Sequence, residues 1–352
     1  MTNKKRCHVP LGEVVLHILK SLGKIILAGI LACFLLTVVA FFYGYTGVHI
    51  PNPTGATDYT WEPGQWRSNM SEGFAWMRMD ADGFNNTEEN EEAAADHVDI
   101  LVMGGSHTEG INVPQDKNYS ALLSKALPDW NVYNIGMSGH FLPTCVSNLP
   151  DALDTYHPTK CVILETGDIE LNAKDMQQVV EGTYPDIPSY SSGTLGNLQR
   201  YMPLIKTQYK NLSDWRAKSA NQERKNPSSK PADIEESTEY AKTVESFLAV
   251  AAESANEHGV HLILCYHPTV QVQSDGSIRD TTDSECLQVF ETTCRENDIT
   301  YVNPFGKIEE MYYSQHVLPQ GFANTSPGSG HINVYGHAMT AEALVTAIQE
   351  AE

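Results

Sequence analysis

Two polar residues in glycine-rich stretches have the types that nucleophilic catalysis requires. Ser106 follows an apolar run and two glycines in ILVMGGSHTEG (residues 100–110), and His331 lies in GSGHINVYGHAM (residues 328–339) near the C-terminus. A serine hydroxyl becomes a nucleophile when a base takes its proton, and histidine is the usual base. Ser106 and His331 are therefore the candidate nucleophile and base of an acyl-transfer reaction. The plainer alternative is a helix-capping serine after a glycine turn and an ordinary loop histidine. A phosphate-binding loop is disfavoured because no lysine follows the glycines.

Further glycine and polar residues follow other apolar runs and are candidates for the same site. GMSGH (136–140), TGDIE (166–170) and His267 each come directly after such a run. Tetrahedral intermediates of acyl transfer need hydrogen-bond donors for the oxyanion, commonly backbone N–H groups of glycine-rich turns. The backbone N–H groups of Ser106 and Gly139 are the candidate donors. The candidate pocket residues are Gly105, His107, His140, Asp168 and His267. His107 and His140 could be catalytic groups or could line the pocket or a turn, Asp168 is expected to brace loops by hydrogen bonds, and His267 is expected to be structural or to lie at the pocket rim.

Five short apolar runs alternate with helical patterns from residue 98 onward. The runs are 98–103, 132–135, 161–165, 260–266 and 299–303, and the helical stretches are 119–127, 145–156, 234–258, 284–297 and 338–351. Near-continuous apolar runs are typical of strands buried on both faces of a parallel sheet. The alternation predicts a doubly wound, three-layer α/β/α sandwich with a central parallel sheet of about five strands. Ligands of such sheets bind at the carboxyl ends of the strands, where the turns that carry Ser106, Gly139 and His267 are expected.

The acidic composition limits the classes of partner and cofactor. The formal net charge is -21, which excludes nucleic acid as the main partner because polyanion binding requires a basic face. The seven cysteines form no CxxC pair, so zinc-ribbon and redox motifs are absent. Buried thiols are the expected state, and one disulfide pair stays open. No cofactor is indicated, and no ligand spacing supports a metal site, including a zinc site made of His107, His140 and His331.

The N-terminal region has the pattern of a membrane anchor. Residues 25–42 contain no charge and no proline, and this length suits one bilayer-spanning helix. Basic residues predominate before it, which places the N-terminus in the cytoplasm and the rest outside, in a single-pass protein of the cell membrane. The expected order is a cytoplasmic tail at 1–24, a transmembrane signal-anchor helix at 25–45, a juxtamembrane segment at 46–95 with a strand-like stretch at 74–80 and a polar break at 85–96, and the main domain at 96–352.

A basic insertion at about 172–238 interrupts the main domain between the third and fourth predicted strands. Its basic residues are Arg200, Lys206, Lys210, Arg216, Lys218, Arg224, Lys225 and Lys230. A solvated helix and linker is one explanation. The other is a docking surface for anionic lipid headgroups, an anionic glycan or a membrane partner.

Three stretches together resemble the Ser, Gly and His blocks of the SGNH/GDSL hydrolase family. They are ILVMGGSHTEG, YNIGMSGH and GHINVYGHAM, and their order and spacing resemble the family over roughly 96–352, apart from the insertion. The resemblance implies a flavodoxin-like sandwich with Ser106 as nucleophile and His331 as base. It also implies that Ser106 and Gly139 supply the oxyanion donors. Members of this family are esterases, lipases, carbohydrate deacetylases and cell-surface O-acyltransferases.

Two positions depart from the family pattern. Gly167 stands where the third block usually has an oxyanion-binding Asn, and Gly328 stands where an Asp usually precedes the histidine. Loss of one oxyanion donor can cost on the order of 100- to 1000-fold in rate. Because Gly328 replaces the usual Asp, we expect a Ser–His dyad whose imidazole is held by a backbone carbonyl.

The expected function is that of a membrane-anchored serine esterase or O-acyltransferase. Its expected substrate is an acylated cell-envelope carbohydrate or another small ester, with acetyl as the acyl group. The resemblance also allows a multi-spanning membrane acyltransferase as partner. The alternative is a non-catalytic envelope accessory protein that binds glycan or such an acyltransferase in the same cleft.

Overall fold

The computed structural model describes residues 11–42, 47–70, 72–167, 169, 173–185 and 234–351. Asp168 and residues 186–233, which hold the whole set of insertion basic residues, lie outside this part of the chain. Their predicted roles therefore remain predictions.

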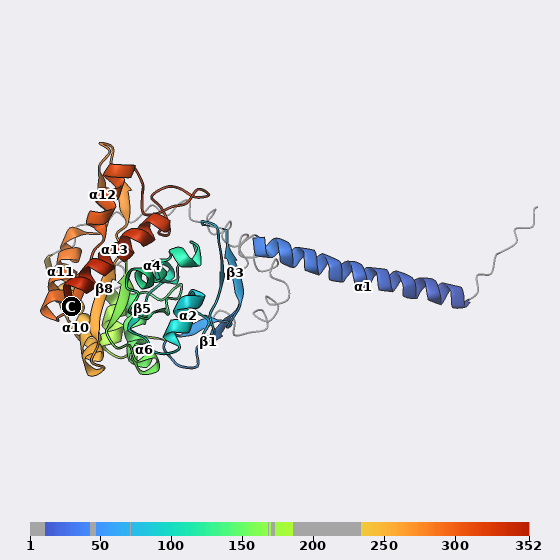
Figure 1. Ribbon diagram of the computed structural model, residues 1–352, viewed down its shortest axis with the longest axis horizontal. Coiled ribbons are helices and arrows are strands. Elements are labelled where there is room, and N and C mark those ends of the chain that lie inside the picture. Colours follow the sequence, from blue (N-terminus) through green and yellow to red (C-terminus); the bar gives the residue numbers. More distant parts are fainter. Residues whose placement is uncertain are drawn as a thin grey trace, which may run out of the picture.

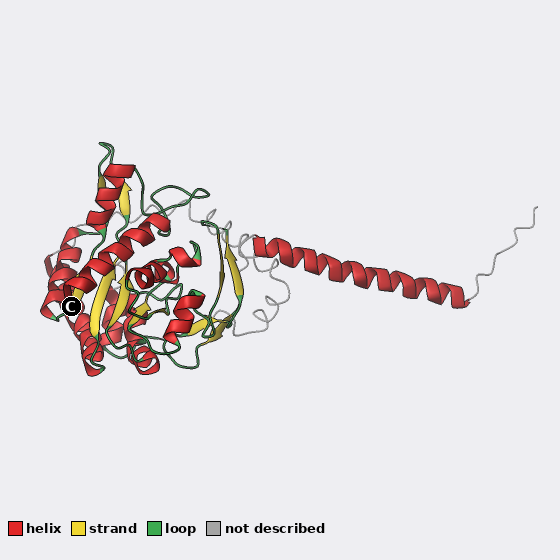
Figure 2. Cartoon of the chain, viewed as in Figure 1, coloured by secondary structure: helices red, strands yellow, loops and turns green. Residues whose placement is uncertain are grey.

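A five-stranded parallel sheet forms the centre of the domain (Figure 2). Its strands are β5 (Ile100–Met103), β6 (Val132–Asn134), β7 (Cys161–Thr166), β8 (His261–Tyr266) and β11 (Thr300–Val302). They lie in the order β11-β8-β7-β5-β6. This is the flavodoxin-like doubly wound order, in which the chain reverses direction across the sheet beside the first strand. All five predicted strands, the parallel sheet and the fold class are confirmed.

Successive side chains of each strand point to opposite faces of the sheet, so each strand contributes to two cores. Ile100 and Val102 pack with α4 and α13 on one face, whereas Leu101 and Met103 pack with α6, α10 and α11 on the other. These helices are α4 (Tyr119–Ala126), α6 (Leu149–Tyr156), α10 (Ile234–Glu257), α11 (Ser284–Glu296) and α13 (Val334–Ala351). The helical stretches predicted from the sequence are confirmed, with α5 (Leu142–Ser147) and α6 in place of one continuous helix.

Shorter elements complete the domain. They are α2 (Glu88–Ala94), α3 (Ser106–Glu109), η1 (Gln115–Lys117), α7 (Ala173–Val180), α12 (Phe305–Gln315), β9 (Val270–Val272) and β10 (Ile278–Asp280). The helix α2 occupies the stretch expected to be a polar break. Thr87 caps it by accepting a hydrogen bond from the backbone N–H of Asn90, and a capped first turn stabilises a helix even in a polar sequence.

The expected juxtamembrane segment is, from residue 47 to residue 95, part of the folded domain. It forms two antiparallel hairpins, β1 (His49–Pro51) with β2 (Tyr59–Trp61) and β3 (Trp66–Asn69) with β4 (Ala75–Arg78). Tyr59, Trp61 and Met77 belong to the main hydrophobic core together with residues of the sheet. The expected domain start at residue 96 is therefore too late, and the described fold begins near residue 47. Short hairpins carry weak local signals because their stability comes from packing on the rest of the core.

The helix α1 (Leu11–Phe42) extends away from the domain (Figure 1). By length and composition it is able to cross a membrane, and its apolar surface is exposed. Residues 11–24, which were expected in a tail, belong to the same helix. Inside the domain, Cys145, Cys161, Cys265 and Cys294 are buried thiols, in accordance with the expected state.

Candidate active site

Ser106 and His331 meet at the carboxyl ends of the central strands. Ser106 is the first residue of α3, directly after the turn that ends β5. Its Oγ lies 2.8 Å from Nε2 of His331, which lies in the loop before α13. This distance is within the hydrogen-bond reach that a general base requires. The turn needs a glycine at 104, because a Cβ there would collide with Thr108 Oγ1 and the Glu165 side chain.

Glu72 provides the group that orients the imidazole. Its Oε2 lies 2.5 Å from Nδ1 of His331, and its Oε1 accepts a 2.6 Å hydrogen bond from the His331 backbone N–H. The expected arrangement, a dyad whose ring is held by a backbone carbonyl, is therefore wrong. The acid comes from the turn between β3 and β4. This turn is distant in the sequence from Gly328, which occupies the position where an Asp was expected. Gly330 allows this approach, since its φ is +84° and a Cβ on it would overlap Glu72 Oε1.

The turn that carries Glu72 is held by asparagine side chains from two other elements. Asn324 Oδ1 accepts a 2.9 Å hydrogen bond from the Gly73 N–H, and its Nδ2 donates to the carbonyl of Met70 over 2.9 Å. Asn112 Nδ2 donates to the Glu72 carbonyl over 3.0 Å. Backbone groups bonded on both sides leave the turn little freedom, so the Glu72 carboxylate is presented to His331 in a fixed position.

Gly139 lies in the loop after β6, next to His140, whose carbonyl oxygen would lie 3.2 Å from a Cβ on Gly105 in the turn before Ser106. Its φ of +93° is a conformation that favours glycine. Among the described residues, neither the Ser106 N–H nor the Gly139 N–H donates a hydrogen bond. The preceding residue is firmly held, because Ser138 N–H and Oγ both donate to the buried Glu109 carboxylate and the Ser138 carbonyl accepts a 2.6 Å hydrogen bond from Tyr59. The two predicted oxyanion donors are therefore near a rigid turn and are not engaged elsewhere in the described chain.

Glu109 itself is neutralised from the N-terminal hairpins. Arg67 Nη1 lies 2.9 Å from Glu109 Oε1, and both side chains are almost completely buried. Trp61 donates to the same oxygen over 2.6 Å, and the Arg67 guanidinium lies 3.4 Å from the centre of the Trp61 ring. Burial acts to raise the pKa of Glu109, but the charge of Arg67 and the hydrogen bonds from Ser138 and Trp61 hold it below its ordinary value.

His140 and Gly105 have bracing positions. The His140 side chain is 2% exposed, its Nε2 lies 3.0 Å from Asp58 Oδ2, and its ring packs edge-on against Tyr59. The Gly105 N–H donates to Glu165 Oε2 over 2.9 Å. Both residues remain candidates for the pocket, and each connects the loop it lies on to a neighbouring element.

The His107 ring packs against the rings of His267 and His331. The His107 ring centre is 4.0 Å from that of His267 and 5.1 Å from that of His331. Nδ1 of His107 accepts a hydrogen bond from the Ile332 N–H, which indicates a neutral ring. Burial, together with the charges of neighbouring histidines, lowers the pKa of His107 well below its ordinary value.

Glu165, at the end of β7, pairs with His267 and holds the nucleophile turn. Its Oε1 lies 2.6 Å from His267 Nε2, while its Oε2 accepts hydrogen bonds from Gly105 N–H and Thr108 Oγ1. Burial acts to raise the pKa of Glu165, but His267 and these hydrogen bonds hold it below its ordinary value. Gly167 leaves room for this pair, because a Cβ on it would lie 2.5 Å from His267 Cε1. The imidazole of His267 therefore fills the space beside residue 167 that a larger residue would need.

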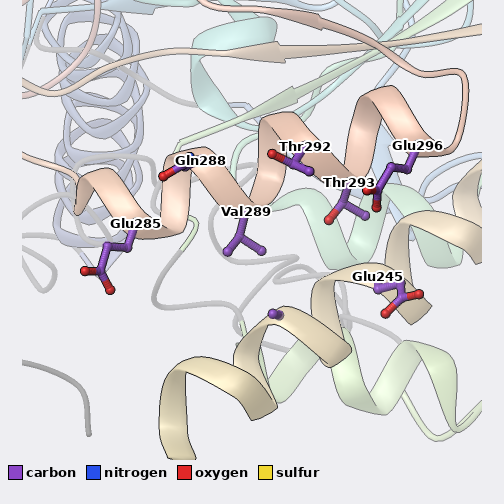
Figure 3. A pocket seen from close by; sticks show the side chains of 8 residues that line it. Glu245, Glu285, Gln288, Val289, Thr292, Thr293 and Glu296 are labelled. Carbon is purple, nitrogen blue, oxygen red and sulfur yellow. The ribbon is translucent and has the colours of Figure 1, made fainter. Parts of the chain in front are cut away.

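A metal site and a surface groove are two other kinds of site that the described chain could contain. No group of three or more His, Cys, Asp or Glu residues in the described ranges is arranged to hold a metal ion. A groove between α10 and α11, lined by residues such as Glu245, Gln288 and Thr292, contains none of the residues around Ser106 (Figure 3).

Comparison with known proteins gives remote structural likenesses. No protein-family model and no curated protein matches the chain. The chain is similar to the crystal structure of TesA, with 14% identity over 72% of this chain and 99% of that one and a TM-score of 0.39. It is similar to a member of the lipolytic protein G-D-S-L family from Veillonella parvula, with 18% identity over 70% and 96% of the two chains and a TM-score of 0.37.

A third similar structure is a two-domain esterase active on acetylated mannans. The identity is 13%, the likeness covers 74% of this chain and 51% of that one, and the TM-score is 0.39.

Proposed function

We propose that this protein is an SGNH-type serine hydrolase that cleaves or transfers an ester-linked acyl group through a Ser106–His331–Glu72 triad. The observation that carries the proposal is the continuous hydrogen-bonded line from Ser106 Oγ through both ring nitrogens of His331 to Glu72 Oε2. A nucleophile, a base and an orienting acid in this arrangement are recognised by geometry and not by their order in the chain.

The proposed reaction has two steps. Ser106 Oγ attacks the ester carbonyl carbon while His331 Nε2 takes the hydroxyl proton, and Glu72 stabilises the imidazolium that results. The N–H groups of Ser106 and Gly139 donate to the oxyanion. Collapse of the intermediate releases the alcohol, which takes its proton from His331, and leaves the acyl group on Ser106. Water or a sugar hydroxyl then attacks the acyl-enzyme, with His331 again as base.

The proposed setting is the outer face of the cell membrane. Helix α1 is long and apolar enough to span a bilayer, and the basic residues before it favour a cytoplasmic N-terminus. The domain would then lie outside, where ester-linked acetyl groups of cell-envelope carbohydrate are the proposed substrate. Transfer to a carbohydrate hydroxyl is the alternative form of the reaction, in which a multi-spanning membrane acyltransferase would supply the acyl group.

One of the two observations that favoured the non-catalytic alternative no longer applies. That alternative rested on Gly167 and Gly328 in place of the expected Asn and Asp. Glu72 contacts His331 where the missing Asp would be needed, and a protein that only binds glycan has no requirement for such a contact.

Labelling with a fluorophosphonate probe tests the proposal. We expect the full chain in detergent to be labelled, and we expect Ser106→Ala and His331→Ala to abolish labelling. Ser314→Ala, which removes a serine hydroxyl from the surface of α12, is the matched control and should be labelled like the wild type. Absence of labelling that depends on Ser106 would overturn the proposed function.

A further inference from the structure

We propose that the outer face of the β3–β4 hairpin rests on the surface of the membrane that α1 enters, so that the Ser106 site lies next to that surface. We call Trp66, Phe74 and Trp76 the aromatic face. These side chains are 60%, 55% and 46% exposed. Clustered exposed apolar side chains on a folded domain are typical of an interaction site.

The strand register places these residues together. Trp66 lies opposite Arg78, and Ser68 lies opposite Trp76. Because side chains alternate along a strand, Trp66 and Trp76 project from the same face of the hairpin, and the Phe74 ring contacts that of Trp76 at 5.5 Å between centres. The alternate residues Arg67, Ala75 and Met77 are buried against the domain. The hairpin thus has a packed inner side and an outer side on which Trp66 and Trp76 are exposed, while Ser68 between them is buried.

The position of α1 indicates what covers the aromatic face. The backbones of α1 and β3 are neighbours, and β3 lies on the side of the domain from which α1 extends (Figure 1). Only six residues separate the end of α1 at Phe42 from the start of β1 at His49. A chain of that length spans at most about 25 Å, so the hairpins stay close to the membrane surface whenever α1 is inserted.

The chemistry of the hairpin suits a lipid surface. Tryptophan is enriched where a bilayer meets water, because its ring is apolar and its N–H is polar. The β3 and β4 strands contain no acidic residue, in a protein whose net charge is -21. Arg67 is buried against Glu109, so Arg78 is the basic residue of these strands that is exposed. Arg78 lies on the outer side, opposite Trp66. Anionic lipid headgroups attract its positive charge, whereas they would repel an acidic surface.

Docking of this face would define the substrate class of the site. The turn between β3 and β4 carries Glu72, which contacts His331, so the hairpin that meets the membrane also forms part of the site. This inference rests on the proposed function and specifies its substrate class. The ester would be one held at the membrane surface, on a lipid-linked or membrane-proximal carbohydrate. Polymer distant from the membrane would be a poor substrate.

Tryptophan fluorescence in lipid vesicles tests the docking. The full chain is reconstituted into phosphatidylcholine–phosphatidylglycerol vesicles, with and without a phosphatidylcholine that carries a nitroxide on its headgroup. We expect the nitroxide to quench part of the emission, and we expect W66F/W76F to remove at least half of the quenchable emission. W130F is the control: Trp130 lies before β6, at the opposite end of the strands from the site, and its loss should leave the quenchable emission unchanged.

Three results would overturn the proposal. One is quenchable emission that is the same in W66F/W76F as in the wild type. Another is its loss in W215F instead, which would assign the contact to the basic insertion. The third is absence of lipid quenching combined with protection of Trp66 and Trp76 from acrylamide by added soluble envelope glycan, which would assign the face to sugar binding. Fluorophosphonate labelling of W66F/W76F in detergent should equal that of the wild type, so failure of the docking and failure of the enzymatic function are distinguishable.

Discussion

Glu72 Oε2 lies 2.5 Å from Nδ1 of His331, although 259 residues separate the two positions in the chain. The acid therefore comes from the N-terminal hairpin and not from the loop that carries the histidine. The same hairpin contains the aromatic face, so the part of the domain nearest α1 also completes the site. This contact is the basis of the first two predictions.

Glu72→Gln should impair the acylation step while leaving the fold intact. Glutamine can still accept the bond from His331 N–H but does not carry the charge that stabilises the imidazolium. We expect kcat for hydrolysis of 4-nitrophenyl acetate to fall on the order of 10³- to 10⁴-fold, the size of effect seen when the acid of a serine triad is amidated, with little change in KM. Glu89→Gln, on the exposed surface of α2, is the matched control. An activity within threefold of the wild type would show that Glu72 does not orient the base.

Gly330→Ala should have a similar effect by displacing Glu72. The new methyl group would overlap Glu72 Oε1, and the φ of +84° adds backbone strain. Gly276→Ala is the matched control, because its φ is +85° and nothing lies within 4 Å of the added Cβ. We expect Gly330→Ala to lose most of its activity and Gly276→Ala to keep it. If the loss arises through Glu72, Gly330→Ala will cause little further loss in the Glu72→Gln background.

Arg67→Met should destabilise the domain. It leaves the Glu109 carboxylate buried without its cation, and breaking one side of a buried pair typically costs about 3–5 kcal/mol. The measurement is urea unfolding of the detergent-solubilised chain. Arg78→Met, on the neighbouring strand with an exposed side chain, should change the free energy of unfolding by less than about 1 kcal/mol. Equal stability of the two variants would contradict the assigned role of Glu109 as a charged anchor of the Ser138 turn.

His337→Asn should weaken the dependence of stability on acid. Burial, with the charges of His331 and His267, lowers the pKa of His337 to about 3. The unfolded chain then binds this proton below the ordinary histidine pKa of about 6.5, whereas the folded chain does not until about pH 3. The stabilising contribution is therefore complete above about pH 6.5 and is lost as the pH falls from there toward 3, by up to about 1.4 kcal/mol per pH unit.

Asparagine at 337 offers an oxygen to the Tyr119 N–H, which His337 Nδ1 accepts in the native chain, but it does not titrate. Unfolding measured between pH 4 and 7 should show a shallower slope for His337→Asn. His316→Asn, at an exposed left-handed helix end that tolerates asparagine, should retain the wild-type slope. Identical slopes for His337→Asn and the wild type would contradict the lowered pKa.

The central elements could be predicted because their signals are local. Residues 161–164 are all apolar, and such a run is buried on both faces whichever helices cover it. Ser106 and His331 were found by the same kind of signal, since glycines next to a strand or a helix mark the turns that present side chains at the sheet edge. The helix α2 was missed because its residues are polar and only the cap at Thr87 marks it.

The pairing of Glu165 with His267 could have been predicted from the sequence. A carboxylate that ends an apolar strand is either exposed beyond the sheet or paired inside it, and here His267 follows the neighbouring strand of the sheet. Glu72 had no such signal, because a glutamate beside a glycine in a polar turn is a common surface pattern and no spacing links it to the distant His331.

The amino-acid sequence by itself determined the order of the five central strands and of the main helices that flank them, the apolar helix at the N-terminus, and the two turns that present Ser106 and His331. These follow from hydrophobic periodicity and from the conformational freedom of glycine, which act over a few residues. Tertiary structure alone decided that Glu72 meets His331, that Arg67 neutralises Glu109, and that Trp66 and Trp76 share an exposed face. Those contacts depend on how the N-terminal hairpins pack on the sheet, and packing between distant segments follows from the shape and charge of the whole core.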